Sequence, residues 1–185
     1  MKGGQGGTII DVASIIKNLE LHPGMRVADF GCGTSGYYLI PTSKEVGDNG
    51  IVYAVDVQPG VLEGVKGLVK QKGLSNVQTV WSDLETPGAT KIEEKSLDRA
   101  YIITVLFQIK KDFEVLKEIA RLLKDGGLLM VVDWRKELCL HIGPPEEMRL
   151  AKDEITKMAG RLNLEFKKEF NPGQCHYGLI YQKII

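Results

Sequence analysis

Stretches of strand length and strand composition alternate with amphipathic stretches of helical length along most of this 185-residue chain. Strands are predicted at residues 25–30, 51–57, 77–81, 100–106 and 128–134. Helices are predicted at residues 8–21, 36–46, 59–69 and 113–123, with Pro41 able to kink the second of them. Because parallel strands need long crossover connections that are usually helical, this alternation is typical of a doubly wound, mostly parallel sheet.

The C-terminal part of the chain follows a different pattern. A helix is predicted over residues 144–162, where two prolines and two acidic residues precede an apolar helical face. Two short strands, residues 164–170 and 176–184, flank a turn at residues 171–173, which predicts an antiparallel hairpin. The expected fold is therefore α/β, a doubly wound seven-stranded sheet that is mostly parallel with a reversed last strand, in a single domain.

Composition limits the class of protein. Hydrophobic residues make up 43% of the chain, enough for a buried core. We assign residues 1–21 to an N-terminal segment with its helix and residues 22–185 to one main domain. The 24 basic and 24 acidic residues cancel, so general nucleic-acid binding is not expected. No apolar run approaches the roughly 20 residues that span a bilayer, so no membrane span is expected.

The three cysteines stand at positions 32, 139 and 175 and include no Cys-x-x-Cys pair. This odd number argues against a disulfide framework and against a zinc site, and we expect no metal. Residues 1–8 are polar and glycine-rich and lack the apolar core of a secretory signal. These features favour a cytoplasmic location. A neutral surface of mixed charge is compatible with a monomer or a homodimer.

Candidate ligand-binding residues follow the predicted strands, because open α/β sheets bind ligands at the carboxyl ends of their strands. The loop after the first strand contains Gly31, Gly33 and Gly36, and such a loop presents N–H groups to an anionic or carboxylate-bearing ligand. Asp56 ends the second strand, where a carboxylate can accept hydrogen bonds from both ribose hydroxyls, and Asp83 follows the third strand. Alternatively, each aspartate is a cap or turn residue, roles in which Asp is common.

The glycine spacing alone also matches dinucleotide-binding folds, but longer motifs resemble the class I S-adenosylmethionine (SAM)-dependent methyltransferases. Residues 27–33 (VADFGCG) resemble the first motif of that family, and residues 53–57 (YAVDV) resemble the second. Residues 81–84 (WSDL) resemble its adenine-binding motif, and residues 122–129 (LLKDGGLL) its helix-to-fifth-strand signature. The terminal hairpin also fits, since that family has a reversed seventh strand whereas nicotinamide-binding folds keep theirs parallel.

The resemblance implies SAM as cofactor, S-adenosylhomocysteine as product, and a set of binding residues. They are Asp29, Gly31, Gly33 and the Thr104 backbone at the methionine end, Asp56 at the ribose, and Ser82, Asp83, Val57 and Leu84 at the adenine. Ser35 stands where the family usually has its third glycine. Either the turn is rearranged or Ser35 adopts a left-handed conformation, which costs roughly 1–2 kcal/mol. Its hydroxyl is a further candidate ligand for the methionine carboxylate.

The implied activity is transfer of the sulfonium methyl group to a small-molecule nucleophile by in-line displacement, with no catalytic residue identified. Residues 1–21 and 136–145 are the segments expected to determine the acceptor. The candidate bases or acceptor ligands are Asp133, Arg135, His141, His176 and Tyr177. Two alternatives remain open: a non-catalytic SAM-binding or partner subunit, and an NAD(P)-dependent oxidoreductase.

Overall fold

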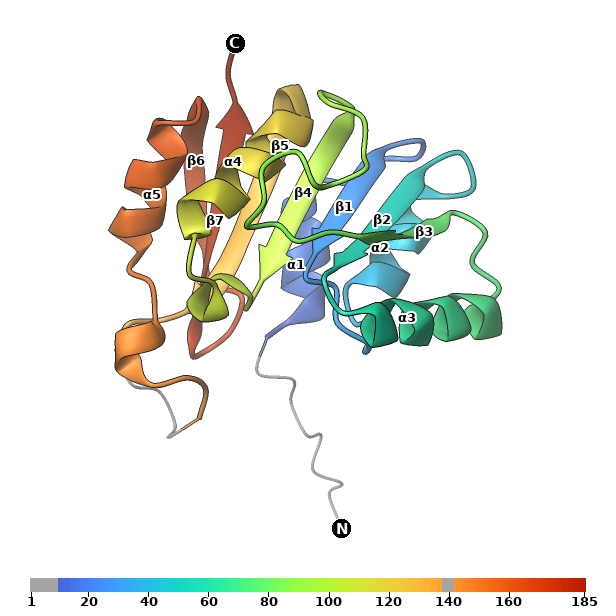
Figure 1. Ribbon diagram of the computed structural model, residues 1–185, viewed down its shortest axis with the longest axis horizontal. Coiled ribbons are helices and arrows are strands. Elements are labelled where there is room, and N and C mark those ends of the chain that lie inside the picture. The colour runs from blue at the N-terminus through green and yellow to red at the C-terminus, as the bar shows by residue number, and fades with distance from the viewer. Residues whose placement is uncertain (1–9, 138–141) are drawn as a thin grey trace.

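The computed structural model describes residues 10–137 and 142–185, which form a single sheet with helices on both faces (Figure 1). The strands are β1 (Arg26–Phe30), β2 (Ile51–Asp56), β3 (Val77–Trp81), β4 (Leu97–Ile103), β5 (Leu123–Trp134), β6 (Leu164–Phe170) and β7 (His176–Lys183). Their order in the sheet is β3-β2-β1-β4-β5-β7-β6, and β7 is antiparallel to both neighbours. All other pairs are parallel. The predicted seven-stranded α/β sheet with a C-terminal hairpin is therefore confirmed.

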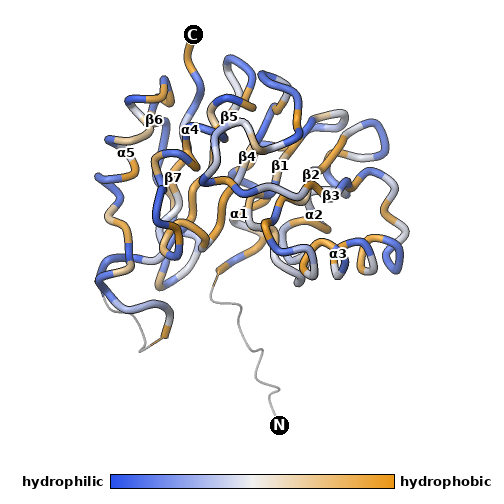
Figure 2. Tube along the Cα trace, viewed as in Figure 1, coloured by the Kyte–Doolittle hydropathy of each residue, from blue (hydrophilic) through white to orange (hydrophobic). Residues whose placement is uncertain are grey.

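Each face of the sheet carries its own hydrophobic core. The helices are α1 (Val12–Leu19), α2 (Leu39–Val46), α3 (Pro59–Lys72), α4 (Asp112–Leu122) and α5 (Lys152–Gly160). The first three bury residues such as Ile15, Leu39 and Val65 with the side chains of one sheet face. α4 and α5 contribute to the core of the opposite face. Figure 2 shows the hydrophobic residues concentrated along the central strands.

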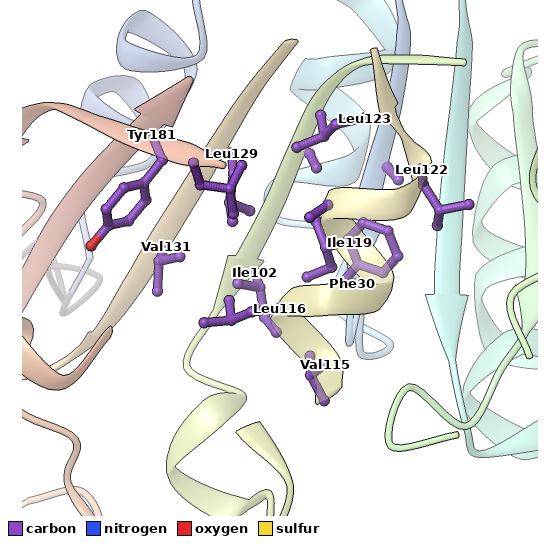
Figure 3. Close-up of a cluster of buried hydrophobic side chains, with 14 of the residues drawn as sticks. Phe30, Ile102, Val115, Leu116, Ile119, Leu122, Leu123, Leu129, Val131 and Tyr181 are labelled. Carbon is purple, nitrogen blue, oxygen red and sulfur yellow. The ribbon is translucent and has the colours of Figure 1, made fainter. Parts of the chain in front are cut away.

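The core under α4 explains the position of the first strand loop. Phe30 at the end of β1 and Ile102 in β4 lie beside Leu116 and Ile119 of α4 (Figure 3), and none of the four is more than 1% exposed. Leu→Ala and Phe→Ala substitutions at such sites cost about 2–5 kcal/mol. This packing holds the carboxyl ends of β1 and β4 side by side, at the edge of the sheet where the candidate ligand-binding residues lie.

Two strand boundaries differ from the sequence prediction. β4 begins at Leu97 rather than at residue 100, and β5 begins at Leu123 rather than at residue 128, because these two leucines pair with each other across the sheet. The residues after Ile103 form a turn and a 3₁₀ helix, Leu106–Gln108, so β4 ends earlier than expected. A register shift between Leu97 and Arg99 explains why the extra pairing left no clear alternation in the sequence.

Two helices also differ. Pro41 lies in the first turn of α2, where the backbone N–H groups lack intrahelical acceptors, so it removes no hydrogen bond from the helix interior. The helix expected over residues 144–162 is divided into a 3₁₀ helix at Glu146–Met148 and α5, with the buried residue Arg149 between them.

Two further sequence expectations concern cysteines and membranes. Cys175 is disulfide-bonded, although the number and spacing of the cysteines argue against a disulfide framework, because spacing along the chain does not report proximity in the fold. Cys32 is buried and free. Within the part of the chain that the structure describes, no helix is long and apolar enough to cross a membrane.

Candidate functional site

A cavity of about 600 Å³ lies at the carboxyl ends of β1, β2 and β4 and beside the residues that follow β3. Eight of the ten residues predicted to bind the cofactor line it: Gly31, Gly33, Asp56, Val57, Ser82, Asp83, Leu84 and Thr104. Asp29 and Ser35 do not. The lining residues that sequence reasoning missed are Gln58, Val61, Glu85, Ile103, Val105, Gln108 and Ile109. Most of them stand next to a predicted residue or one helical turn beyond it, and this adjacency is the signal that could have found them.

The glycine loop is shaped by close backbone packing. The N–H groups of Gly31 and Cys32 both donate to the carbonyl oxygen of Val55, at 2.8 and 3.1 Å, which folds the loop over the end of β2. Gly31 has φ +76°, and a Cβ built on it would lie 2.5 Å from Cγ2 of Val105. Only glycine fits there, because the backbone is left-handed and the space is filled.

The structure resolves the question raised by Ser35. Gly36 has φ +66°, whereas Ser35 is not among the residues with positive φ, so the turn is shifted by one residue. The predicted strain at Ser35 is therefore absent. The Ser35 side chain is exposed, and its Oγ accepts a long bond of 3.5 Å from the Tyr37 N–H.

Asp56 joins the glycine loop to the start of α3. Its side chain is 8% exposed, and its two carboxylate oxygens accept hydrogen bonds from the N–H groups of Gly33 (3.3 Å) and Gln58 (3.0 Å). A carboxylate offers about four acceptor positions. These two bonds therefore leave capacity for hydroxyl groups of a ligand in the cavity that Asp56 lines.

Asp83 is a turn residue and a cavity residue at once. Its oxygens accept hydrogen bonds from the Glu85 N–H (3.0 Å) and the Thr86 hydroxyl (2.9 Å), which is the pattern of an Asx turn. The preceding residue, Ser82, directs its hydroxyl inward to the hydroxyl of Thr90 at 2.8 Å. The alternative that Asp83 shapes a turn is thus right, and the residue lines the cavity as well.

A buried carboxylate holds this loop in place from α4. Glu118 accepts hydrogen bonds from the N–H groups of Gly88 (2.9 Å) and Thr90 (3.0 Å) and forms an ion pair with Arg121 at 2.7 Å. Burial acts to raise the pKa of Glu118, but these hydrogen bonds outweigh it and lower the pKa to about 2. The charged carboxylate therefore fixes the loop that carries Asp83.

Asp29 is buried and does not line the cavity. It is 3% exposed, and burial, with a contribution from the charge of Asp56, raises its pKa to about 8 against the opposing effect of a hydrogen bond with Tyr101. Tyr101 is its register partner on β4, and the tyrosine hydroxyl also lies 3.4 Å from Oγ1 of Thr42. Asp29 is therefore uncharged at neutral pH and links β1 to β4.

A second cavity, of about 210 Å³, adjoins the first at Thr104. Its lining residues are Ile10, Val12, Tyr37, Tyr38, Thr104, Trp134 and His176. Thr104 has φ +53°, an uncommon conformation for a β-branched residue, and its N–H donates to the carbonyl oxygen of Val132 at 2.8 Å. Such strain is concentrated at functional sites in proteins.

His176 is a buried histidine in the lining of this second cavity. It is 1% exposed, and its ring lies against Trp134 with 4.1 Å between the ring centroids. Burial lowers its pKa to about 4, and the positive charges of Arg135 and Arg149 act in the same direction. Among the described residues, neither ring nitrogen has a hydrogen-bond partner.

Sequence reasoning missed Arg149, which organises the segment beside this cavity. The side chain is 2% exposed and donates hydrogen bonds to four backbone carbonyls. The acceptors are the carbonyl oxygens of Pro144 (2.9 Å), Arg135 (3.1 Å), Glu137 (3.0 Å) and Ile142 (3.1 Å). The guanidinium also lies over the Trp134 ring at 5.6 Å. No local pattern marks this residue, because the acceptors of its hydrogen bonds are all backbone atoms.

The remaining candidate bases lie elsewhere. Asp133 is 1% exposed and lines neither cavity, and burial raises its pKa to about 6. The Tyr177 hydroxyl donates to the carbonyl oxygen of Leu150 at 2.9 Å. Arg135 lines neither cavity and acts on His176 through its charge. His141 lies outside the described residues.

The sheet order, the terminal hairpin and a ligand cavity at the carboxyl ends of the strands define a Rossmann-like protein of the methyltransferase type. The family described as "Methyltransferase domain" matches residues 21–183. The chain therefore belongs to the methyltransferase domain family. This confirms the predicted class, the SAM-dependent methyltransferases with the class I fold.

Individual relatives agree. A demethylmenaquinone methyltransferase from Staphylococcus aureus is 32% identical over 120 residues, covering 64% of this chain and 47% of that protein. Aklanonic acid methyltransferase DauC from a Streptomyces species is 40% identical over 65 residues, covering 35% of this chain and 29% of that protein. The chain thus matches less than half the length of these relatives. The crystal structure of a SAM-dependent methyltransferase from Aquifex aeolicus aligns with a TM-score of 0.85 and 26% identity, covering 95% of this chain and 91% of that one.

Proposed function

We propose that this protein transfers the methyl group of SAM to a small-molecule acceptor. The observation that carries the proposal is that one cavity collects the glycine loop, Asp56 and Asp83, and that a second cavity adjoins it at Thr104. The volume of the first cavity, about 600 Å³, is in the range of roughly 300–1,000 Å³ that is usual for small-molecule sites. The two relatives named above are methyltransferases of small molecules.

The lining residues have the chemistry that SAM requires. The free acceptor positions of Asp56 suit the two ribose hydroxyls, and Asp83 suits the adenine amino group. Val57 and Leu84 offer apolar surface to the two faces of the base. At the other end, the N–H of Thr104 is occupied by Val132, so its carbonyl oxygen is the candidate partner for the methionine ammonium.

SAM supplies a methyl group that its sulfonium already activates, so the main task of the protein is to hold donor and acceptor in line. The left-handed conformation of Thr104 serves this task because it places one residue on the wall of both cavities. Ile10 and Val12 line the second cavity and belong to the N-terminal segment predicted to determine the acceptor, which supports the second cavity as the acceptor side.

Calorimetric titration with S-adenosylhomocysteine tests the proposal without knowledge of the acceptor. The wild-type protein should bind it and should bind neither NAD nor NADP. Asp56→Asn should weaken binding roughly tenfold or more, since a hydrogen bond to a charged group contributes about 1.5–3 kcal/mol. Asp48→Asn, at an exposed loop position, is the matched control and should leave binding unchanged.

The outcomes separate the alternatives. Binding of NAD or NADP alone would overturn the proposal in favour of an oxidoreductase. An unchanged dissociation constant in Asp56→Asn would overturn the site assignment. If binding behaves as expected, SAM labelled in its methyl group is incubated at a limiting concentration with a small-molecule extract. Label in new products, reduced with Asp56→Asn, distinguishes an enzyme from a non-catalytic SAM-binding subunit.

A further inference from the structure

Residues 82–90 form a loop that supplies part of the wall of the larger cavity. Its residues in that wall are Ser82, Asp83, Leu84 and Glu85. The hydroxyl groups of Ser82 and Thr90, at the two ends of the loop, lie 2.8 Å apart, and the two residues are only 1% and 2% exposed. Within the loop, the Thr86 N–H donates to the carbonyl oxygen of Asp83 at 3.1 Å. The loop is therefore closed at its base by a pair of buried hydroxyl groups.

The C-terminal end of the 82–90 loop is fastened to α4. Glu118 is 2% exposed and accepts hydrogen bonds from the N–H groups of Gly88 (2.9 Å) and Thr90 (3.0 Å). Arg121 donates to both oxygens of the Glu118 carboxylate, at 2.7 and 2.9 Å, and to the carbonyl oxygen of Thr90 at 3.3 Å. Thr90 is thus fixed through its N–H and its carbonyl group, and its hydroxyl continues the connection to Ser82.

Ser82 links this connection to both aspartates of the cavity. Its N–H donates to the carbonyl oxygen of Asp56 at 3.1 Å, and Asp83 is the next residue in the chain. The Asp83 carboxylate is oriented by the loop itself, since it accepts hydrogen bonds from the Glu85 N–H (3.0 Å) and the Thr86 hydroxyl (2.9 Å). A carboxylate offers about four acceptor positions, so two remain for a ligand. Their direction depends on where the loop holds Ser82 and Asp83.

A second carboxylate ties the loop to the start of α4. Oε1 of Glu85 accepts hydrogen bonds from the N–H groups of Lys110 (2.7 Å) and Lys111 (3.2 Å), and Lys111 is the residue that precedes the first turn of α4. The helix is anchored in the core by four fully buried residues (Figure 3), which are Val115, Leu116, Ile119 and Leu122. The loop is therefore supported at two points by a helix whose position is set by its packing on the sheet.

We propose that Glu118 is a positioning residue that determines which nucleobase the larger cavity accepts. Through Thr90 and Ser82 it holds the Asp83 carboxylate where the amino group of adenine can donate to it and where a carbonyl oxygen would be repelled. This inference rests on the proposed function, in which Asp83 receives the adenine amino group. Glu118 does not line the cavity, so the inference adds a determinant of specificity outside the binding site.

Discrimination between such bases depends on geometry. Adenine has an amino group where hypoxanthine has a carbonyl oxygen, so one base donates to a carboxylate at this place and the other cannot. Hydrogen bonds weaken steeply as the angle at the hydrogen falls below about 120°. A carboxylate on a loop that shifts therefore loses part of its bond to the amino group and turns away from the carbonyl oxygen. Both effects lower the preference for adenine, even where the remaining contacts still bind the ligand.

Calorimetric titration compares S-adenosylhomocysteine with S-inosylhomocysteine, which differ only in the base. Wild-type protein should bind S-adenosylhomocysteine roughly 10- to 100-fold more tightly. Asp83→Asn should lose most of this preference, because the NH₂ group of its amide can donate to the carbonyl oxygen of hypoxanthine. Glu118→Gln should lower the preference roughly fivefold, because the amide cannot accept all the hydrogen bonds that the carboxylate accepts from the loop and from Arg121.

Two variants of Thr90 test the same connection if the loss of Glu118 unfolds the protein. Thr90→Val replaces the hydroxyl that bonds to Ser82 with a methyl group and keeps the N–H that donates to Glu118, and it should lower the preference roughly fivefold. Thr90→Ser retains the hydroxyl and should keep the wild-type preference. Glu94→Gln is the matched control, because it removes the exposed carboxylate that pairs with Arg121 at 3.0 Å outside the loop, and it should leave the preference unchanged.

Each outcome bears on a different claim. Failure of the wild-type protein to bind S-adenosylhomocysteine overturns the proposed function, and this inference with it. Normal binding with an unchanged preference in Glu118→Gln and Thr90→Val overturns this inference alone, since a merely structural role weakens both ligands equally or lowers only the melting temperature. A full preference in Asp83→Asn shows that Asp83 is not the group that Glu118 positions. Equal losses in Thr90→Val and Thr90→Ser, or a loss in Glu94→Gln, overturn the connection through the two hydroxyl groups.

Discussion

Gly31→Ala should destabilise the protein by about 2–5 kcal/mol, because the substitution introduces two independent penalties. The φ of Gly31 is +76°, and a residue with a Cβ costs roughly 1–2 kcal/mol in that conformation. The new Cβ would lie 2.5 Å from Cγ2 and 3.1 Å from Cγ1 of Val105. Overpacking of this kind costs typically about 1–3 kcal/mol more.

The two penalties can be separated by matched variants. Gly33 has φ +57°, but a Cβ there would meet nothing within 4 Å, so Gly33→Ala should lose only the conformational part, about 1–2 kcal/mol. Val105→Ala removes both atoms that the new Cβ approaches. The double variant Gly31→Ala/Val105→Ala should therefore be more stable than the sum of the single effects predicts, by about 1–3 kcal/mol.

Urea unfolding followed by circular dichroism gives the free energy of unfolding of each variant, provided that the transitions are two-state with equal slopes. The close approach of the glycine loop to Val105 would be refuted by two results together. These are equal losses in Gly31→Ala and Gly33→Ala, and additive effects in the double variant.

Three further predictions concern buried ionisable groups. Glu118→Gln should lower the free energy of unfolding by about 2–3 kcal/mol at pH 7. Because the pKa of Glu118 is lowered from 4.5 to about 2, this loss should be present above about pH 4.5 and should vanish as the pH falls toward 2. A difference that stays constant with pH would contradict this. Asp29→Asn should be more stable than wild type at pH 7 by about 2–4 kcal/mol. Burial raises the pKa of Asp29 from 3.8 to about 8, so wild-type protein must take up a proton when it folds at a pH between these two values. The gain should disappear near pH 4, and parallel pH profiles of the free energy of unfolding would disprove it. Arg149→Met should lose about 3 kcal/mol or more in thermal unfolding, since four carbonyls lose their donor; full stability would show that water replaces the guanidinium.

Most of the residues that line the larger cavity could be predicted from sequence because their determinants are local. A left-handed turn at Gly31 and a carboxylate at the end of a strand, as at Asp56, each require a particular residue at a particular place in a short segment. The parallel order of β1, β2 and β4 then brings these segments together without further information. The shift of the third glycine to position 36 was visible too, but its effect on the backbone at Ser35 needed the structure.

The strand and helix boundaries that were wrong depend on partners distant in sequence. Leu97 and Leu123 extend their strands only because they pair with each other, and neither sits in a strongly alternating stretch. The helix expected over residues 144–162 is interrupted because Arg149 bonds to carbonyls on both sides of the preceding loop. Helical spacing of apolar residues could not reveal this competition, since the competing acceptors are backbone atoms that every residue has.

The second cavity illustrates the same limit. Its wall combines Val12 from the N-terminal segment, Tyr38 after the glycine loop, Trp134 at the end of β5 and His176 at the start of β7. Trp134 and His176 are register partners on antiparallel strands, so their contact follows from the reversed hairpin rather than from any motif. A motif within one segment cannot mark this cavity, because four segments share its wall.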